Sequence, residues 1–256
     1  MHIPRLHDWP ITEADAVALQ HELVARVDTS TPPSGPIRFV AGCDIAYHLT
    51  EARLFAAVVV LKVSDLSVVE TRTTSRGVTF PYIPGLLSFR EIPALLDTFG
   101  ELLQPPDAVM LDGQGIAHPR RFGLACHLGL WLDLPCVGCA KNWLAGDHAE
   151  PGPNAGDATP LTIDGETVGA VVRSATGVKP VYVSPGHRID VASATALVRA
   201  TLSGYRHPAP TREAHMAANR LRSGRVEDED RRAADNAEER RLGKRRRVFL
   251  RHGLLF

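Results

Sequence analysis

Three extended segments near the start of the chain, separated by short gaps, set the strongest limit on its fold. Residues 39–47 read FVAGCDIAY and residues 54–63 read LFAAVVVLKV. Residues 67–75 read SVVETRTTS, in which a valine pair leads into Thr and Arg positions. β-Branched residues at this density favour strands, and connections this short join strands that run in opposite directions. We therefore expect an antiparallel three-stranded meander in the first third of the chain.

Strand and helix patterns alternate beyond the meander. Pro93 is expected in the first turn of one helix and Pro119 at the start of the next, because proline suits the first helical position. The hydroxyl of Thr211 is expected to cap a later helix. The expected strands are residues 107–111, 135–139 and 181–183, with a hairpin that turns at Asp164 and Gly165. This order predicts an α/β fold with a mixed sheet, in which the meander is followed by parallel strands and helices flank both faces.

The size and composition are those of one large domain with a real core. The chain has 256 residues, 44% of them apolar, and no apolar run approaches the roughly 18 residues of a membrane helix. The N-terminus lacks a basic stretch followed by an apolar one, so we expect no secretory signal. Four cysteines are too few for a disulfide scaffold. We expect a cytoplasmic monomer with no membrane association.

The charge pattern changes near residue 222. Residues 221–256 hold 11 Lys and Arg against 7 Asp and Glu, including the runs EDED and KRRR, whereas the preceding residues carry an excess of acid. Charge runs of this kind are usually solvated or disordered, and the alternative is a basic arm that contacts phosphates. We therefore expect one folded domain of residues 1–222 and a charged extension of residues 223–256 that is partly disordered.

Three acidic side chains occur where the expected sheet could bring them together. Asp44 lies in the first extended segment, Glu91 at the entry to the first helix after the meander, and Asp112 at the end of the next strand. If those two strands are neighbours, Asp44 and Asp112 meet and Glu91 reaches them from the side. Carboxylates about 4 Å apart repel by roughly 4 kcal/mol per pair at an effective dielectric near 20, so such a cluster takes up protons or holds a cation. All-oxygen ligands suit Mg²⁺ or Mn²⁺.

Two loops near these acids have a composition that suits ligand binding. Residues 112–118 read DGQGIAH, and an acid that leaves a strand beside glycines suits a site that a bulky ligand approaches closely. Residues 80–85 read FPYIPG, in which two prolines stiffen a tight, exposed loop. Each pattern alone is equally typical of an ordinary turn.

Several long sequence blocks, in order, resemble the endonuclease V family. GCDIAY contains Asp44, PYIPGLLSFRE ends at Glu91, DGQGIAHPRRFGLACHLG begins at Asp112, and GCAKN contains Lys141. VYVSPGHRID and TREAHMAANRLR resemble later blocks of the family. The resemblance implies a ribonuclease-H-like fold and a Mg²⁺-dependent enzyme, in which Mn²⁺ can replace Mg²⁺. It also implies nicking of single- or double-stranded DNA that contains deaminated purines, above all hypoxanthine, at the second phosphodiester bond 3′ to the lesion.

The resemblance also implies roles for individual residues, in three groups. The catalytic group consists of the metal ligands Asp44, Glu91 and Asp112, with Lys141 and His215. The DNA-binding group consists of the strand-separating loop Pro81, Tyr82, Ile83 and Pro84, with His118. The base-pocket group consists of Gly113 and Gly138. The chain departs from the family pattern at Cys126, where a serine is expected, and at Cys139, where an aliphatic residue is expected; neither departure removes a ligand.

Three alternatives stay open on the sequence alone. Cys136 and Cys139 form a single C-x-x-C pattern, which is a weak signal for zinc or redox chemistry and is more typical of buried small residues. A non-catalytic nucleic-acid-binding module on the same fold would have lost an acid, and all three acids are present. A preference for inosine in RNA would depend on contacts to a 2′-hydroxyl, which no motif here reveals.

Overall fold

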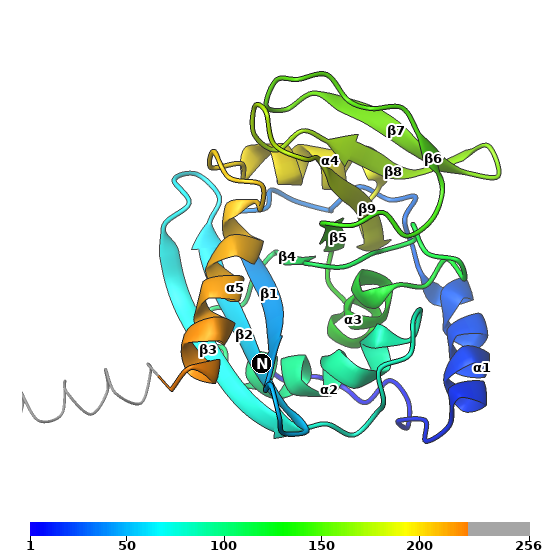
Figure 1. Cartoon of the computed structure of the whole chain (residues 1–256), viewed down its shortest axis with the longest axis vertical. Coiled ribbons are helices and arrows are strands. Elements are labelled where there is room, and N and C mark those ends of the chain that lie inside the picture. The colour runs from blue at the N-terminus through cyan, green and yellow to red at the C-terminus, as the bar shows by residue number, and fades with distance from the viewer. Residues whose placement is uncertain (225–256) are drawn as a thin grey trace, which may run out of the picture.

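A nine-stranded mixed sheet organises the part of the chain that the computed structural model describes, residues 1–224 (Figure 1). The expectations for the charged extension concern almost entirely residues outside this range. The strands are β1 (Phe39–Tyr47), β2 (Arg53–Lys62), β3 (Val68–Gly77), β4 (Ala108–Leu111), β5 (Cys136–Ala140), β6 (Asp147–His148), β7 (Ala158–Ile163), β8 (Glu166–Val172) and β9 (Val181–His187). The helices are α1 (Glu13–Leu23), η1 (Val24–Arg26), α2 (Leu87–Gly100), α3 (Leu124–Leu132), α4 (Val191–Ala200) and α5 (Ala209–Arg222).

The sheet confirms the expected meander and the parallel strands that follow it. Its order is β3-β2-β1-β4-β5-β9-β8-β7-β6. β1 and β3 pair antiparallel with β2, while β4 pairs parallel with β1 and β5 parallel with β4. The order of the first five strands is that of a ribonuclease-H-like fold. β9 then runs antiparallel to β5, and β8, β7 and β6 extend the sheet antiparallel, with the expected hairpin turn at Asp164 and Gly165.

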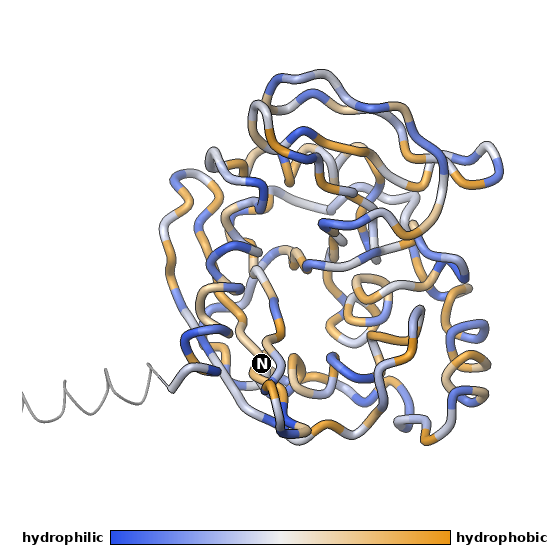
Figure 2. The backbone as a smooth tube through the Cα atoms, viewed as in Figure 1, coloured by the Kyte–Doolittle hydropathy of each residue, from blue (hydrophilic) through white to orange (hydrophobic). Residues whose placement is uncertain are grey.

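Helices cover the two faces of the sheet, as the sequence predicts. α4 and α5 pack on one face, where Val40, Val59 and Met110 contribute to a buried apolar cluster. α2 and α3 pack on the other face, around Val58, Val109 and Leu128. Figure 2 shows apolar residues throughout the body of the protein and an alternation of hydrophobic and hydrophilic residues along α1, which lies at its edge. None of the described helices combines the length and apolar content that crossing a membrane requires.

The prediction that Pro93 opens a helix is wrong, because α2 begins six residues earlier at Leu87 and contains Pro93 in its interior. An interior proline removes one backbone hydrogen bond. The helix persists because tertiary packing stabilises it: Phe89, Ile92 and Leu95 are all buried. Glu91 therefore projects from the second turn of a packed helix and not from its entry.

The expected starts of two other helices are also wrong. Pro119 lies in a series of turns, and Arg121 has a φ of 53°, so regular helix begins only at Leu124. Thr211 lies buried inside the first turn of α5, which Pro208 precedes as the capping residue. The Thr211 hydroxyl donates a hydrogen bond to the Pro208 carbonyl at 3.2 Å. In both places backbone turns determine where the helix begins. The Thr211 side chain does not cap the helix, because its hydroxyl bonds the Pro208 carbonyl.

Gly42 determines how closely α5 approaches the sheet. A Cβ atom at this position would lie 1.9 Å from the carbonyl oxygen of Pro210, in the first turn of α5. A side chain would therefore force the helix away from β1. Because α5 carries His215 and β1 carries Asp44, this backbone contact also sets the distance between two residues of the site described below.

We predict that Gly42→Ala destabilises the protein by about 3 kcal/mol, the upper range for overpacking, because the added methyl group meets backbone atoms that cannot rotate away. Chemical denaturation measures the free energy of unfolding. Gly77→Ala is the matched control, since nothing lies within 4 Å of a Cβ at the end of β3. Equal stability of the two variants would show that α5 does not depend on this contact.

Candidate active site

Three carboxylates line one hollow beside the neighbouring inner strands β1 and β4. Asp44 lies in β1 and Asp112 directly follows β4, and these strands are parallel neighbours with Cys43 opposite Leu111. Glu91 reaches the same hollow from α2. The hollow has a volume of about 210 Å³, and Lys141 and His215 also line it. The structure thus brings together the five residues of the expected catalytic group.

Each acid has a partner within the protein. The Lys141 Nζ lies 2.7 Å from an Asp112 oxygen, and the His215 Nδ1 lies 2.7 Å from an Asp44 oxygen. The Tyr47 hydroxyl donates a hydrogen bond to Glu91. With the acids held in this way, no group of three His, Cys, Asp or Glu side chains within residues 1–224 already has metal-binding geometry.

The neighbouring groups compensate the negative charge of the site only in part. Burial raises the pKa of Glu91 to about 8; the nearby Asp44 and Asp112 add to this shift, and the Tyr47 hydrogen bond opposes it. Burial also raises the pKa of Asp44, and its hydrogen bond from His215 limits the increase. A carboxyl group with a pKa near 8, such as Glu91, retains its proton at neutral pH and can accept a positive charge in its place. Carboxyl oxygen atoms are the ligands that Mg²⁺ and Mn²⁺ prefer, so the donor set fits a hard divalent cation.

A second hollow, of about 180 Å³, lies beside the acids and beneath the loop at residues 81–85. The residues that line it include Tyr82, Ile83, Pro84, Gly113, Gln114, His118 and Leu144. Pro81 and Tyr82 are exposed, and Tyr82 retains 67% of its accessible surface. Leu124 lines both this hollow and the hollow of the acids, so the two are adjacent.

The two glycines of the expected base pocket occupy different places. Gly113 lines the second hollow, and a Cβ there would meet only the Leu124 side chain, at 3.0 Å. Gly138 does not line it. A Cβ at Gly138 would lie 2.5 Å from the Gly115 nitrogen and 2.6 Å from the Gly113 oxygen. Gly138 therefore supports the glycine loop from behind, and its lack of a side chain lets that loop lie on β5.

Two residues that the sequence did not single out hold the exposed loop in position. The carbonyl of Gly85, at the end of the loop, accepts hydrogen bonds from Gln20 at 3.0 Å and from Arg120 at 2.8 Å. Gln20 is 1% exposed and also bonds the Phe122 carbonyl at 3.1 Å. No sequence pattern pointed to Gln20, because its partners Gly85 and Phe122 are 65 and 102 residues away in the chain. These hydrogen bonds fix the end of the exposed loop relative to α1 and to the segment around Arg120.

His118 lies in the wall of the second hollow and is almost completely buried. Its Nδ1 accepts a hydrogen bond from the Arg120 backbone at 3.2 Å. Burial, with a contribution from the Arg120 charge, lowers the pKa of His118 to about 4. The imidazole is therefore neutral at physiological pH and can face a ligand as a hydrogen-bonding group without charge.

Cys136 and Cys139 lie on opposite faces of β5. Cys136 packs in the cluster beneath α2 and α3, and Cys139 packs in the cluster beneath α4 and α5. Both are buried free cysteines, and burial raises the pKa of both thiols. Side chains that face opposite sides of a sheet cannot bind one ion or form one disulfide, so the structure assigns both to the core.

Comparison with known protein families gives a match over most of the chain. The family model described as Endonuclease V matches residues 21–216. Endonuclease V of Nostoc punctiforme is 46% identical over 219 residues, which cover 86% of this chain and 99% of that protein. Endonuclease V of Gloeobacter violaceus is 47% identical over 226 residues, which cover 86% of this chain and 90% of that protein.

Solved structures agree with this match. The crystal structure of endonuclease V from Streptomyces avermitilis is 43% identical, with a TM-score of 0.80, and the match covers 85% of this chain and 96% of that one. Human endonuclease V is 31% identical, with a TM-score of 0.75, and the match covers 84% of this chain and 100% of that one. The chain described here therefore belongs to the endonuclease V family, and it is a nuclease of the hydrolase class with a ribonuclease-H-like fold.

Proposed function

We propose that this protein is a Mg²⁺-dependent endonuclease that nicks the strand containing deoxyinosine. The proposed cut is at the second phosphodiester bond 3′ to the lesion and leaves a 3′-hydroxyl and a 5′-phosphate. The observation that carries the proposal is the adjacency of two hollows: one is lined by three carboxylates, and the other lies beneath a braced, exposed loop. Chemistry on the strand and recognition of a base beside it require two such sites.

Recognition of the lesion requires a base to leave the stack. The second hollow is the proposed receptor for that base, with Gly113 allowing its backbone to approach closely and His118 and Gln114 as polar wall groups. The ring of Tyr82, exposed at the tip of a loop that Gln20 and Arg120 hold, is the proposed filler of the vacated space. Endonuclease V of Ciona intestinalis, whose fold this chain shares at 24% identity, has been crystallised with DNA that contains an inosine.

Asp44, Asp112 and Glu91 are the proposed ligands of the divalent cation, for which Mn²⁺ can substitute. When bound, such a cation supplies an activated water and stabilises the leaving oxygen. The partially uncompensated charge of the three acids supports this assignment, since a cation would relieve the repulsion that burial strengthens.

Lys141 and His215 complete the proposed catalytic set. The Lys141 ammonium is one-third exposed and lies against Asp112, where it can hold a water molecule or a phosphate oxygen. His215 is half exposed beside Asp44, and the amide of Asn219, one turn later on α5, lies 3.2 Å from its Nε2. Both side chains can therefore reach a phosphate that approaches the acids from solvent.

The test of the proposed function is cleavage of oligonucleotides that contain one deoxyinosine, with and without Mg²⁺, with the cut mapped to the nucleotide. The proposal predicts a single Mg²⁺-dependent nick at the second bond 3′ to the lesion. Matched oligonucleotides that contain inosine in RNA measure the preference between the two sugars. Cutting of RNA alone, or no cutting of either substrate, would overturn the proposal.

We predict that Asp44→Asn and Asp112→Asn each lower the rate of nicking by roughly a thousandfold or more, about 4 kcal/mol of activation free energy, because an amide is a poor ligand for a hard cation. Asp97→Asn is the matched control, since Asp97 is an exposed acid on α2 that pairs with Arg76. Thermal unfolding verifies that each variant folds. Mg²⁺-dependent nicking that survives in both site variants would remove these residues from the cation site.

We predict that Tyr82→Ala weakens binding to a deoxyinosine-containing duplex by about 1–3 kcal/mol, the contribution of one stacked base. Binding to the same lesion in a single strand should change much less, because only the duplex leaves a gap to be filled. Equilibrium binding with Ca²⁺ in place of Mg²⁺ measures both affinities. Equal losses on the two substrates would show that Tyr82 does not act as a filler.

A further inference from the structure

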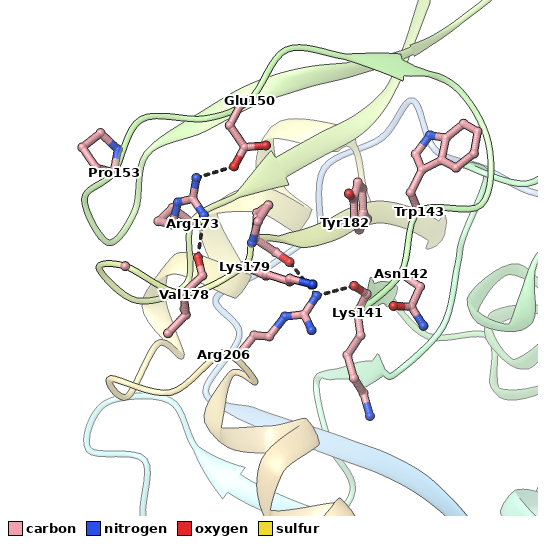
Figure 3. Close-up of a pocket in the computed structure, with 12 residues that line it drawn as sticks. Lys141, Asn142, Trp143, Glu150, Pro153, Arg173, Val178, Lys179, Tyr182 and Arg206 are labelled. Atoms are coloured by element: carbon pink, nitrogen blue, oxygen red, sulfur yellow. Dashed lines mark hydrogen bonds and ion pairs between the residues drawn. The ribbon is translucent and has the colours of Figure 1, made fainter.

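A third hollow has a volume of about 650 Å³, and Figure 3 shows residues that line it. It lies between the segment that follows β5, the loop that joins β8 to β9, and the segment before α5. Lys141 lines both this hollow and the hollow of the acids. The proposed catalytic residues do not account for the rest of its lining.

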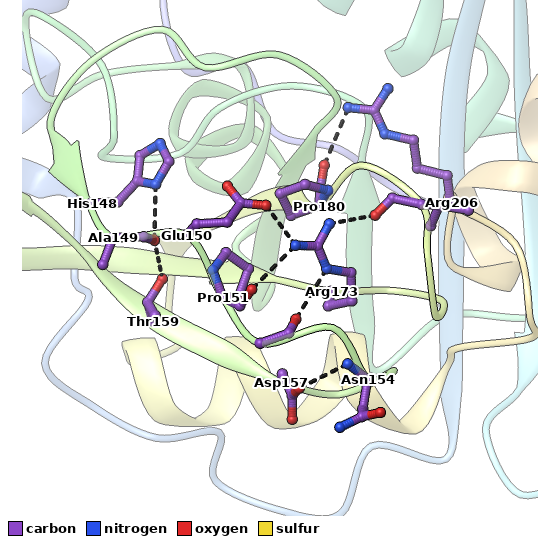
Figure 4. A network of polar contacts seen from close by, with 12 residues as sticks. His148, Ala149, Glu150, Pro151, Asn154, Asp157, Thr159, Arg173, Pro180 and Arg206 are labelled. Carbon is purple, nitrogen blue, oxygen red and sulfur yellow. Dashed lines mark hydrogen bonds and ion pairs between the residues drawn. The ribbon is translucent and has the colours of Figure 1, made fainter.

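Arg173 builds one wall of this hollow. Its guanidinium donates hydrogen bonds to the carbonyls of Gly152 at 3.1 Å, Pro151 at 3.1 Å and Val178 at 2.5 Å, and it pairs with Glu150 at 2.5 Å (Figure 4). These contacts hold the loop after β6 against the loop after β8. Arg173 thus fixes the shape of the hollow and has little hydrogen-bonding capacity left for a ligand.

Arg206 connects the hollow to the candidate active site. Its guanidinium donates one hydrogen bond to the Pro180 carbonyl at 3.2 Å and another to the Lys141 carbonyl. The backbone of Lys141 is thereby tied to the start of β9. Arg206 therefore links the segment that carries Lys141 to the segment that forms the opposite wall of the hollow.

The groups that face this hollow and can contact a ligand include a cation, aromatic rings and the exposed side chain of Asn142. Lys179 is exposed at the hollow, and Glu150, already paired with Arg173, is the one acid in the lining among the described residues. Trp143 retains 56% of its accessible surface, yet its Nε1 is fixed by a 2.7 Å hydrogen bond to the Gly146 carbonyl. Tyr182 lies in the same lining. A positive charge and a fixed, exposed indole in one hollow are the composition of a groove that binds single-stranded nucleic acid.

One short segment connects all three hollows. Leu144 lines the base hollow, Trp143 lines the third hollow, and Lys141 lines both the third hollow and the hollow of the acids. The hollow of the acids shares Leu124 with the base hollow and Lys141 with the third hollow, whereas the base hollow and the third hollow share no lining residue, so the acids lie between them. A strand whose base occupies the first and whose phosphate lies at the acids continues into the third. Because the proposed cut is 3′ to the lesion, the part of the strand that reaches the third hollow is the part beyond the cut.

We propose that the third hollow binds the nucleotides on the 3′ side of the cleaved bond, with Lys179 at their phosphates and Trp143 stacked on a base. The assignment rests on the proposed function for its direction along the strand. It assigns to Trp143 and Lys179 a role in holding the strand after the cut, separate from lesion recognition and from the chemistry.

The test varies the length of substrate on each side of the lesion. Single-stranded oligonucleotides with one deoxyinosine carry either one or eight nucleotides beyond the cut, at a constant 5′ length, and a second series varies only the 5′ side. Wild-type kcat/KM should rise with the 3′ length and respond little to the 5′ length. Trp143→Ala and Lys179→Ala should each lower kcat/KM about tenfold on the long 3′ substrate, within the range of one stacked base, and have little effect on the short one.

Matched controls separate this role from general effects. Lys62→Ala removes an exposed lysine at the end of β2, opposite Phe39 at the start of β1 and five residues along that strand from Asp44. Leu103→Ala removes an exposed apolar residue that follows α2. Both should leave kcat/KM unchanged on every substrate. Equal effects of Trp143→Ala and Lys179→Ala on short and long substrates, or no effect on either, would overturn the assignment.

Failure of the proposed function has a different result. If the wild-type protein cuts none of the substrates, the groove is judged by equilibrium binding of an undamaged single strand, measured at several salt concentrations. Lys179→Ala should then reduce the slope of log K against log salt by about one, the value for one lost phosphate contact. Trp143→Ala should weaken binding about tenfold at an unchanged slope. Unchanged binding by both variants would overturn the groove independently of any cleavage.

Discussion

The repulsion among three carboxylates in one hollow, one buried and two half-buried, is the interaction on which the rest of this structure depends. Asp44, Glu91 and Asp112 line one small hollow, and burial raises the pKa values of Asp44 and Glu91. Tyr47, Lys141 and His215 each compensate one acid. A protein tolerates such a cluster when a ligand repays the cost, and a hard divalent cation is the ligand that matches oxygen donors and negative charge. The cluster therefore costs stability, and the proposed cation would offset that cost.

The surrounding fold maintains that arrangement through backbone contacts. The parallel pairing of β1 with β4 places Asp44 beside Asp112, and Gly42 lets α5 lie close enough for His215 to reach Asp44. Gly138 lets the glycine loop after Asp112 lie directly on β5. These glycines stand where backbone meets backbone, so side chains there would shift whole elements and separate groups that must act together.

Local patterns predicted the meander, because short connections join its strands. They predicted that Asp44 and Asp112 meet only if their strands are neighbours, and the pairing of β1 with β4 confirms that condition. The same patterns placed Pro93, Pro119 and Thr211 at helix starts, and packing or backbone turns decided otherwise. The sequence could not predict the hydrogen bond from Gln20 to Gly85 that holds the exposed loop, because the two residues are 65 positions apart. The third hollow likewise depends on loops that only the folded sheet brings together. Long-range polar contacts leave no periodic signal in a sequence.

The most direct test of the central claim is the stabilisation that Mg²⁺ confers at different pH values, measured as the difference in free energy of unfolding with and without the cation. Where the Glu91 carboxyl is protonated, Mg²⁺ must displace that proton, so with a pKa of about 8 the competition weakens as the pH rises. The account predicts that the stabilisation grows from pH 6 to pH 8, by up to about 1.4 kcal/mol per pH unit. Buried groups remote from the site, such as His127, contribute equally to both series. Stabilisation that is absent, or that is the same at both pH values, would contradict the account.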